Sequence, residues 1–87
     1  MNTIDGPGPG PGVLLAELRA AGVTDLRGNH GGGWVVGRAP SGATIEVLWW
    51  SYRGVYHVSR RVTDEKISEA LGEYPDRVTA VAEAAGA

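Results

Sequence analysis

Residues 43–62 read ATIEVLWWSYRGVYHVSRRV, and this stretch decides the fold of the chain. β-Branched and aromatic residues dominate it and recur with a period of two, which is typical of a pleated, half-buried strand and not of a helix. The dipeptide Arg53-Gly54 interrupts the pattern near its middle, where a tight turn is expected. The stretch therefore predicts two long antiparallel strands, residues 43–52 and 55–62, joined as a hairpin.

Large apolar side chains occupy both faces of the first predicted strand. One face carries Ile45, Val47 and Trp49. The opposite face carries Thr44, Glu46, Leu48, Trp50 and Tyr52. A sheet in a small domain usually buries only one face against its helices, so one of the two adjacent Trp should point away from the core. The surplus apolar surface predicts contact with another molecule.

We expect the second face to form a partner-binding patch, because Trp, Tyr and Arg are enriched at the energetic centres of protein interfaces. On the second strand, His57 alternates out of register with Tyr56 and Val58, so it lies near Trp50 if those two face the helices. The candidate partner-binding residues are Leu48, Trp50, Tyr52, Arg53, Val55, His57 and Arg61.

Upstream of the hairpin, the sequence predicts one helix and shorter strands. Residues 13–21 (VLLAELRAA) carry an apolar stripe at helical spacing, and Gly22 is the expected C-terminal cap. A weakly patterned strand is expected at 23–27, and a clearer one at 34–38. The connecting turns are predicted at residues 28–33 and 39–42.

Downstream of the hairpin, the sequence predicts helical structure. Thr63 is a suitable helix cap, and the acids that follow it suit the positive end of a helix dipole. Gly72 and Pro75 interrupt the helical pattern, with Pro75 as the first residue of a second segment. The apolar positions at helical spacing are Ile67, Ala70, Leu71, Val78, Val81, Ala82 and Ala85.

These elements predict an α+β fold built on a single antiparallel β-meander sheet of three to four strands. An N-terminal helix and a C-terminal helix, or a broken helix pair, should pack on one face. Residues 1–12 end in GPGPGPG, which can neither pair in a sheet nor wind a helix. We expect a Pro/Gly-rich flexible arm at 1–12 and a single small α+β domain at 13–87. The alternative is an arm that becomes ordered against a neighbouring subunit.

The formal charge of the 87-residue chain is −2, which disfavours a dedicated nucleic-acid binder. Six Arg against four acids give residues 1–62 a charge of +2, whereas residues 63–87 carry −4. The chain has no Cys, no leader pattern and no apolar run of membrane-spanning length. We therefore expect a cytoplasmic protein, or one within a soluble assembly such as a virion, that is not secreted by an N-terminal signal.

One short motif and the two histidines could carry chemistry. For each, a glycine-rich turn or a histidine on the sheet surface is the simpler explanation. His30-Gly31-Gly32-Gly33 matches the HGGG string of some esterases, but the nucleophile elbow that they need is missing. His30 and His57 are the only histidines, and no pair has zinc-ligand spacing. The sequence predicts no enzyme, no cofactor and no metal site.

The leading hypothesis is a non-catalytic protein–protein interaction module that uses an aromatic sheet face. Its partner would be another protein or a copy of the same chain in a homo-oligomer. A narrower form is a small accessory or phage-encoded component of a larger assembly. The alternative is a sheet-based single-stranded nucleic-acid-binding domain, because aromatic and Arg residues interleave on the strands. No membrane partner is expected.

Overall fold

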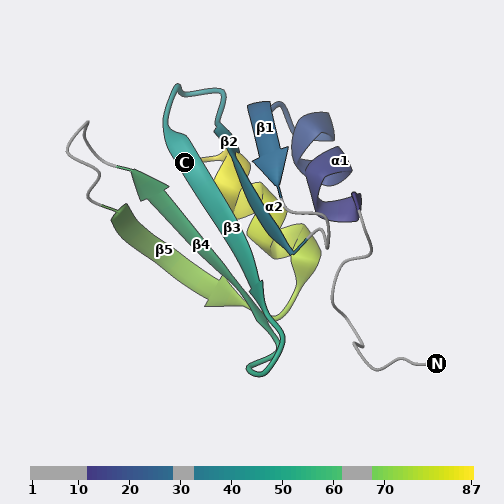
Figure 1. The fold of residues 1–87 in the computed structure, drawn as a ribbon. Coiled ribbons are helices and arrows are strands. Elements are labelled where there is room, and N and C mark those ends of the chain that lie inside the picture. Colours follow the sequence, from purple (N-terminus) through teal and green to yellow (C-terminus); the bar gives the residue numbers. More distant parts are fainter. Residues whose placement is uncertain (1–11, 29–32, 62–67) are drawn as a thin grey trace.

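The computed structural model describes residues 12–28, 33–61 and 68–87 of the chain. In chain order its elements are α1 (Val13–Ala20), β1 (Thr24–Gly28), β2 (Trp34–Arg38), β3 (Thr44–Trp50), β4 (Val55–Arg61), β5 (Ser68–Tyr74) and α2 (Arg77–Ala85). The strands form one antiparallel sheet in the order β1-β2-β3-β4-β5, so each strand pairs with its neighbours in sequence (Figure 1). The predicted α+β meander is therefore confirmed, with one strand more than the three to four expected.

The predicted β3–β4 hairpin is present, and its turn is longer than the predicted Arg53-Gly54 turn, so each strand pair lies two residues from the register that a two-residue turn would give. Trp49 lies opposite Tyr56, and Trp50 lies opposite Val55 as the last pair of the ladder. The four residues 51–54 form the turn, in which Gly54 adopts a φ of +68° and donates its backbone N–H to the Trp50 carbonyl at 2.8 Å. Tyr52, expected on the first strand, therefore lies in the turn.

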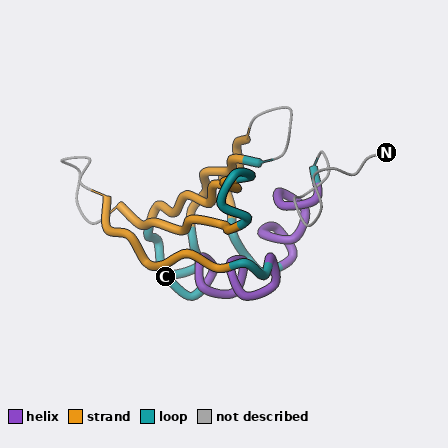
Figure 2. The backbone as a smooth tube through the Cα atoms, turned by 90° about the horizontal axis from the view of Figure 1, so that it is seen from below, coloured by secondary structure: helices purple, strands orange, loops and turns teal. Residues whose placement is uncertain are grey.

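Both helices cover the same face of the sheet, as Figure 2 shows from below the molecule. The α2 helix contacts β3, β4 and β5, whereas α1 contacts β1 and α2. No helix of the described residues covers the other face of the sheet, so among these residues a side chain on it is exposed unless its strand neighbours cover it. This arrangement is the one-faced packing that the sequence predicts.

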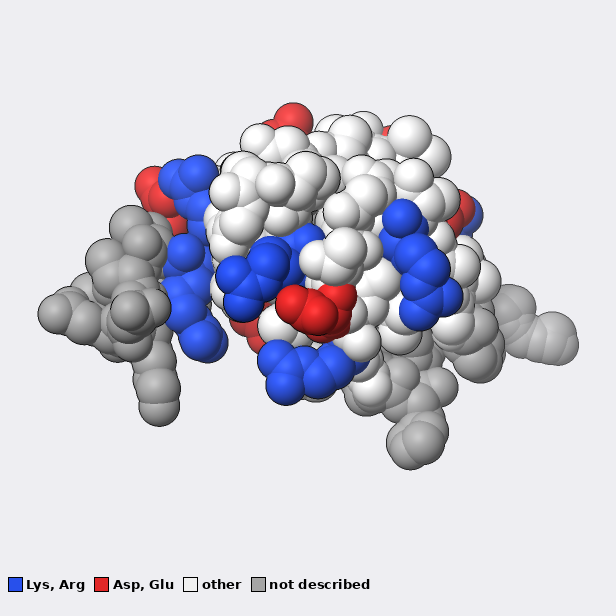
Figure 3. All heavy atoms as spheres, turned by 90° about the horizontal axis from the view of Figure 1, so that it is seen from above, with Lys and Arg blue, Asp and Glu red and all other residues white. Residues whose placement is uncertain are grey.

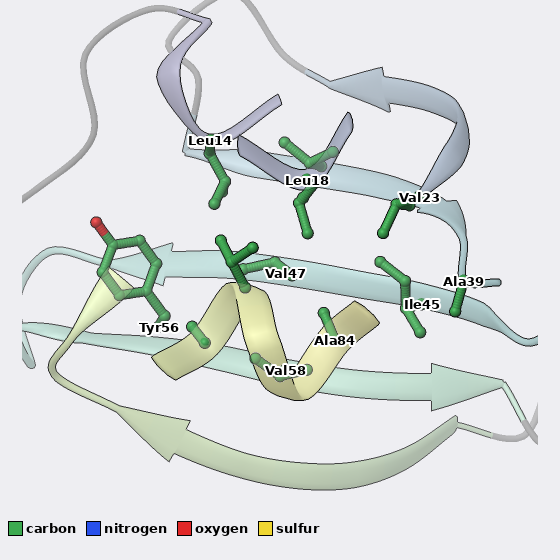
Figure 4. Packing of buried hydrophobic residues seen from close by; sticks show 12 residues of the cluster. Leu14, Leu18, Val23, Ala39, Ile45, Val47, Tyr56, Val58 and Ala84 are labelled. Atoms are coloured by element: carbon green, nitrogen blue, oxygen red, sulfur yellow. The ribbon is translucent and has the colours of Figure 1, made fainter. Parts of the chain in front are cut away.

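The core lies between the helices and the sheet face that carries Ile45 and Val47, and both side chains are fully buried. Figure 4 shows Leu14, Leu18 and Val23 pointing toward these two residues. The remaining buried apolar residues are Val35, Ala39, Tyr56, Val58, Ala80, Val81 and Ala84. A core of this size is small, as expected for a short chain with no Phe.

Capping hydrogen bonds mark the C-terminal end of α1 and the start of α2. Gly22, with a φ of +98°, follows α1 and donates to the carbonyl of Arg19, while Val23 donates to the carbonyl of Leu18. These two bonds form a Schellman motif, which confirms Gly22 as the cap. The α2 helix begins at the Asp76 cap, whose carboxylate accepts the Thr79 N–H at 2.8 Å. The first residue of α2 is therefore Arg77, two residues after Pro75, which was predicted to be the first residue of this helix.

The prediction of a helix that runs to the interruption at Gly72 is wrong for residues 68–71, because Ser68–Tyr74 is the edge strand β5. Glu, Ala and Leu favour a helix in isolation, and the spacing of Ala70 and Leu71 fits one. Without β5, the edge of β4 that faces away from β3 would be unpaired. In the folded chain, β5 lies along this edge and pairs with the backbone groups from Tyr56 to Arg61. The broken helix pair is thus replaced by one strand and one helix.

Several predicted features lie outside the described residues. They are the arm at 1–11, the turn residues 29–32 with most of the HGGG string, and the helix start at Thr63. No helix in the three described ranges is long and apolar enough to cross a membrane.

Candidate partner-binding surface

The outer face of the sheet has an aromatic end beside the β3–β4 turn. Trp50 and Leu48 project from β3, and Val55 and His57 project from β4 as their direct cross-strand neighbours. Tyr52 in the turn is 81% exposed, the largest exposure of any large apolar side chain in the described part of the chain. We call this surface the aromatic patch, and it consists of Leu48, Trp50, Tyr52, Arg53, Val55 and His57.

The two adjacent Trp residues point to opposite sides of the sheet. Trp49 packs against the core, and its ring centroid lies 4.6 Å from that of Tyr56. Trp50 lies on the outer face, where its ring is 5.3 Å from His57 and 5.9 Å from Tyr52. The expectation that one Trp points away from the core is confirmed, and that residue is Trp50.

Arg53 covers the Trp50 ring and is itself held in place from β5. Its guanidinium carbon lies 5.5 Å from the ring centroid, which is cation–π geometry. A terminal nitrogen of Arg53 donates to Glu73 Oε1 at 2.8 Å. Contacts from the hairpin turn and from the edge strand thus meet at the Trp50 ring.

Glu73 also faces His57 from the same strand pair. The His57 Nδ1 atom lies 3.6 Å from Glu73 Oε2, beyond hydrogen-bond distance, and it is buried without a hydrogen-bond partner among the described residues. Glu73 therefore holds Arg53 by a hydrogen bond and places a carboxylate beside His57. Sequence reasoning missed it because a helical pattern interrupted at Gly72 was predicted here and no strand, so nothing indicated that Glu73 would lie opposite His57.

Arg61 is the candidate residue that the structure separates from the others. It lies at the opposite end of β4, paired with Thr44 and Ser68. Six residues of extended chain place it ~20 Å from Val55. The other six candidate residues come together, and Arg61 belongs to a second region of the outer face.

A polar network divides these two regions. Trp34 on β2 donates its indole N–H to the Glu46 carboxylate on β3, and the Ser59 hydroxyl lies 3.5 Å from the other Glu46 oxygen. Ser59 is buried, although the period-two pattern placed it on the exposed face.

The far end of the outer face is hollowed and basic. A groove of about 390 Å³ is lined by Asp25, Leu26, Arg27, Val36, Gly37, Arg38 and Thr44. A smaller hollow of about 120 Å³ shares Val36 and Thr44 with it and adds Arg61. Figure 3, which views this end from above, shows several basic groups spread over the surface with fewer acidic groups between them.

The described residues include no group of three or more His, Asp or Glu side chains that could hold a metal ion. Comparison with known proteins gives no match of this chain to a family model, to a curated protein or to a solved structure. The inference of function therefore rests on the geometry of the outer face.

Proposed function

We propose that the chain is a non-catalytic module that binds a protein partner through the aromatic patch. The observation that carries this proposal is the position of Trp50. A large aromatic side chain lies at the turn end of the outer sheet face, flanked by Tyr52, His57 and Arg53. Trp, Tyr and Arg grouped in this way are typical of the residues that dominate binding energy at interfaces.

Preorganisation supports the same proposal. Each immobilised side chain at an interface costs about 0.5–1.5 kcal/mol of lost freedom on binding. Here the Arg53 side chain already donates a hydrogen bond to Glu73, and the Trp50 ring already lies against both Arg53 and His57. A partner that docks on the patch meets groups that are already ordered.

A single-stranded nucleic acid fits the patch less well than a protein does. A base stacks on a free aromatic face, but Arg53 lies over the Trp50 ring and would have to leave. Glu46 and Glu73 bring carboxylates onto the same face, where they repel a phosphate backbone. The charge pattern of the outer face is mixed, as at protein interfaces, and is not a continuous cationic track.

The test is affinity capture with the full chain from lysate of the source cell, with one half treated with nuclease. We expect a stoichiometric protein that survives nuclease, is lost with Trp50→Ala and is retained with Val78→Ala. Val78 is the matched control, because it is an apolar side chain 68% exposed on the helical side of the molecule. Capture that disappears with nuclease, or that Val78→Ala reduces equally, contradicts the proposal.

A place in a larger assembly, such as a virion or a phage-encoded complex, remains the narrower form of this proposal. If residues 1–12 act as an assembly arm, their deletion should reduce association with the captured partner. If they are a passive tail, the deletion should leave capture unchanged.

A further inference from the structure

Apart from Arg19 on α1, the arginines of this chain fall into two groups. Arg53, Arg60 and Arg77 are each paired with a glutamate, at 2.8 Å for Arg53 and 2.7 Å for Arg77. Arg27 and Arg61 are exposed and form no ion pair within the described ranges. The arginines of the first group form ion pairs with the chain's own glutamates, whereas those of the second group are available to bind another molecule.

Arg38 completes the available group. Its only acidic neighbour in the described part of the chain is Asp25, at 3.4 Å, and both side chains are more than half exposed. It also donates a long hydrogen bond of 3.4 Å to the carbonyl of Gly42 in the β2–β3 turn. Exposed contacts of this kind contribute little energy, so a stronger anion can replace them.

The sheet brings these three arginines to one place from three different strands. Arg38 and Arg61 are both direct neighbours of Thr44, which puts them two strand spacings or ~10 Å apart. Arg27 lies opposite Val36, two residues from Arg38 on the same face. The hollows between them are floored by Val36 and Thr44, so an anion seated there would be partly removed from water.

We propose that this basic groove, formed by Arg27, Arg38 and Arg61, binds an acidic, extended peptide segment of the protein partner. The inference deepens the proposed function and rests on it for the source of the segment. Alternate side chains of an extended peptide lie ~7 Å apart on one side, and the long Arg38 and Arg61 side chains start ~10 Å apart, so neighbouring carboxylates of one peptide are within their reach. One partner chain could therefore place apolar residues on the aromatic patch and carboxylates in the groove.

A peptide is favoured over a nucleic acid by the acids that line the same hollows. Asp25 forms one wall of the large groove, and Glu46 lines the smaller hollow. A peptide can present uncharged or donor groups at these points, whereas a nucleic acid carries a phosphate at every step. Nucleic acid is thus the alternative that the experiment must separate.

The experiment measures fluorescence anisotropy of a labelled oligoglutamate peptide with the full chain at low salt. We expect saturable binding that weakens as salt screens the charges. The Arg27→Gln/Arg38→Gln/Arg61→Gln variant should bind about tenfold more weakly. The matched control is Arg19→Gln, which removes an exposed arginine from α1 and should bind like the parent chain.

Arg38 contacts the β2–β3 turn, so Arg27→Gln/Arg61→Gln, which leaves that turn intact, serves as a second variant. It should lose affinity in the same direction but by less. Circular dichroism and the urea midpoint of each variant report whether the fold is retained. Equal loss with Arg19→Gln would show that only net charge matters, and this result would overturn the proposal.

Two other results also contradict it. One is the absence of oligoglutamate binding at low salt. The other is tighter binding of an oligothymidylate of matched charge, which would make the groove a nucleic-acid site. The failure of this inference can be told apart from failure of the proposed function, because partner capture depends on Trp50. If partner capture is lost with Trp50→Ala but is unchanged in the arginine variants, the proposal for the aromatic patch stands and the proposal for the basic groove is rejected.

Discussion

The Arg77 guanidinium of α2 donates two hydrogen bonds to the Glu17 carboxylate of α1, one at 2.7 Å and one at 3.2 Å. The two residues are 60 positions apart in the sequence. The hydrogen bond to Glu17 is the main reason that the pKa of Arg77 is raised. Burial raises the pKa of the neighbouring Tyr56, and Arg77 opposes that change. The pair therefore joins the two helices beside Tyr56, near the first residue of β4.

Replacement of either partner should lower the free energy of unfolding. For Glu17→Gln we expect a loss of about 0.5–1 kcal/mol, because the pair is bidentate but about one third of each side chain is exposed. Urea unfolding of Glu17→Gln, Arg77→Gln and the double variant measures the coupling. Strictly additive losses would mean that the two side chains act independently, contrary to this expectation.

The two adjacent Trp residues should respond differently to truncation. Trp49→Ala removes a ring that packs on the core and on Tyr56, so we expect a loss of about 2–4 kcal/mol in stability. Trp50→Ala removes only outer-face contacts and should cost about 1 kcal/mol. Thermal unfolding compares the two variants. A larger loss for Trp50→Ala would make Trp50 a core residue and remove the basis of the aromatic patch.

Gly37 in β2 should not tolerate a side chain. A Cβ atom at this buried position would lie 2.7 Å from Val23 Cγ1 and 2.9 Å from Leu26 Cδ2. Gly37→Ala should therefore destabilise the domain by about 1–3 kcal/mol through overpacking. Gly33→Ala is the matched control, because its Cβ would meet Trp49 only at an ordinary contact distance of 3.6 Å. Equal urea midpoints for the two variants would contradict the packing seen here.

The cap of α2 should make stability depend on pH in the acid range. The Asp76 carboxylate accepts hydrogen bonds from the Thr79 side chain and backbone, and these bonds lower the pKa of Asp76. The charged form is thus favoured in the folded state, so its stabilisation is complete above the ordinary Asp pKa and is lost as pH falls through the lowered value.

Asp76→Asn tests this expectation, because Asn is a comparable cap that does not titrate in this range. Its urea midpoint should be close to that of the parent chain at neutral pH. Between neutral and acid pH, the midpoint of the variant should fall less than that of the parent chain. Parallel decreases in both proteins would show that Asp76 does not contribute to the acid dependence.

The sequence alone determined the hairpin and the orientation of its side chains. Period-two alternation over residues 43–62 places Ile45 and Val47 in the core and Trp50 on the outer face, because successive side chains of a strand must point to opposite sides. Gly22 was equally predictable, since the left-handed conformation that closes α1 is least costly for glycine. These features depend on local geometry, which a sequence pattern records directly.

Tertiary structure alone decided the identity of residues 68–74 and the composition of the candidate surface. Their helix-favouring composition is overridden because the open edge of β4 offers backbone partners that a local helix would leave unpaired. That strand brings Glu73 beside Arg53 and His57. Arg61 lies at the opposite end of β4 from Val55, so it lines a separate hollow. Such contacts join residues that are distant in the chain, so they arise only when the sheet is assembled.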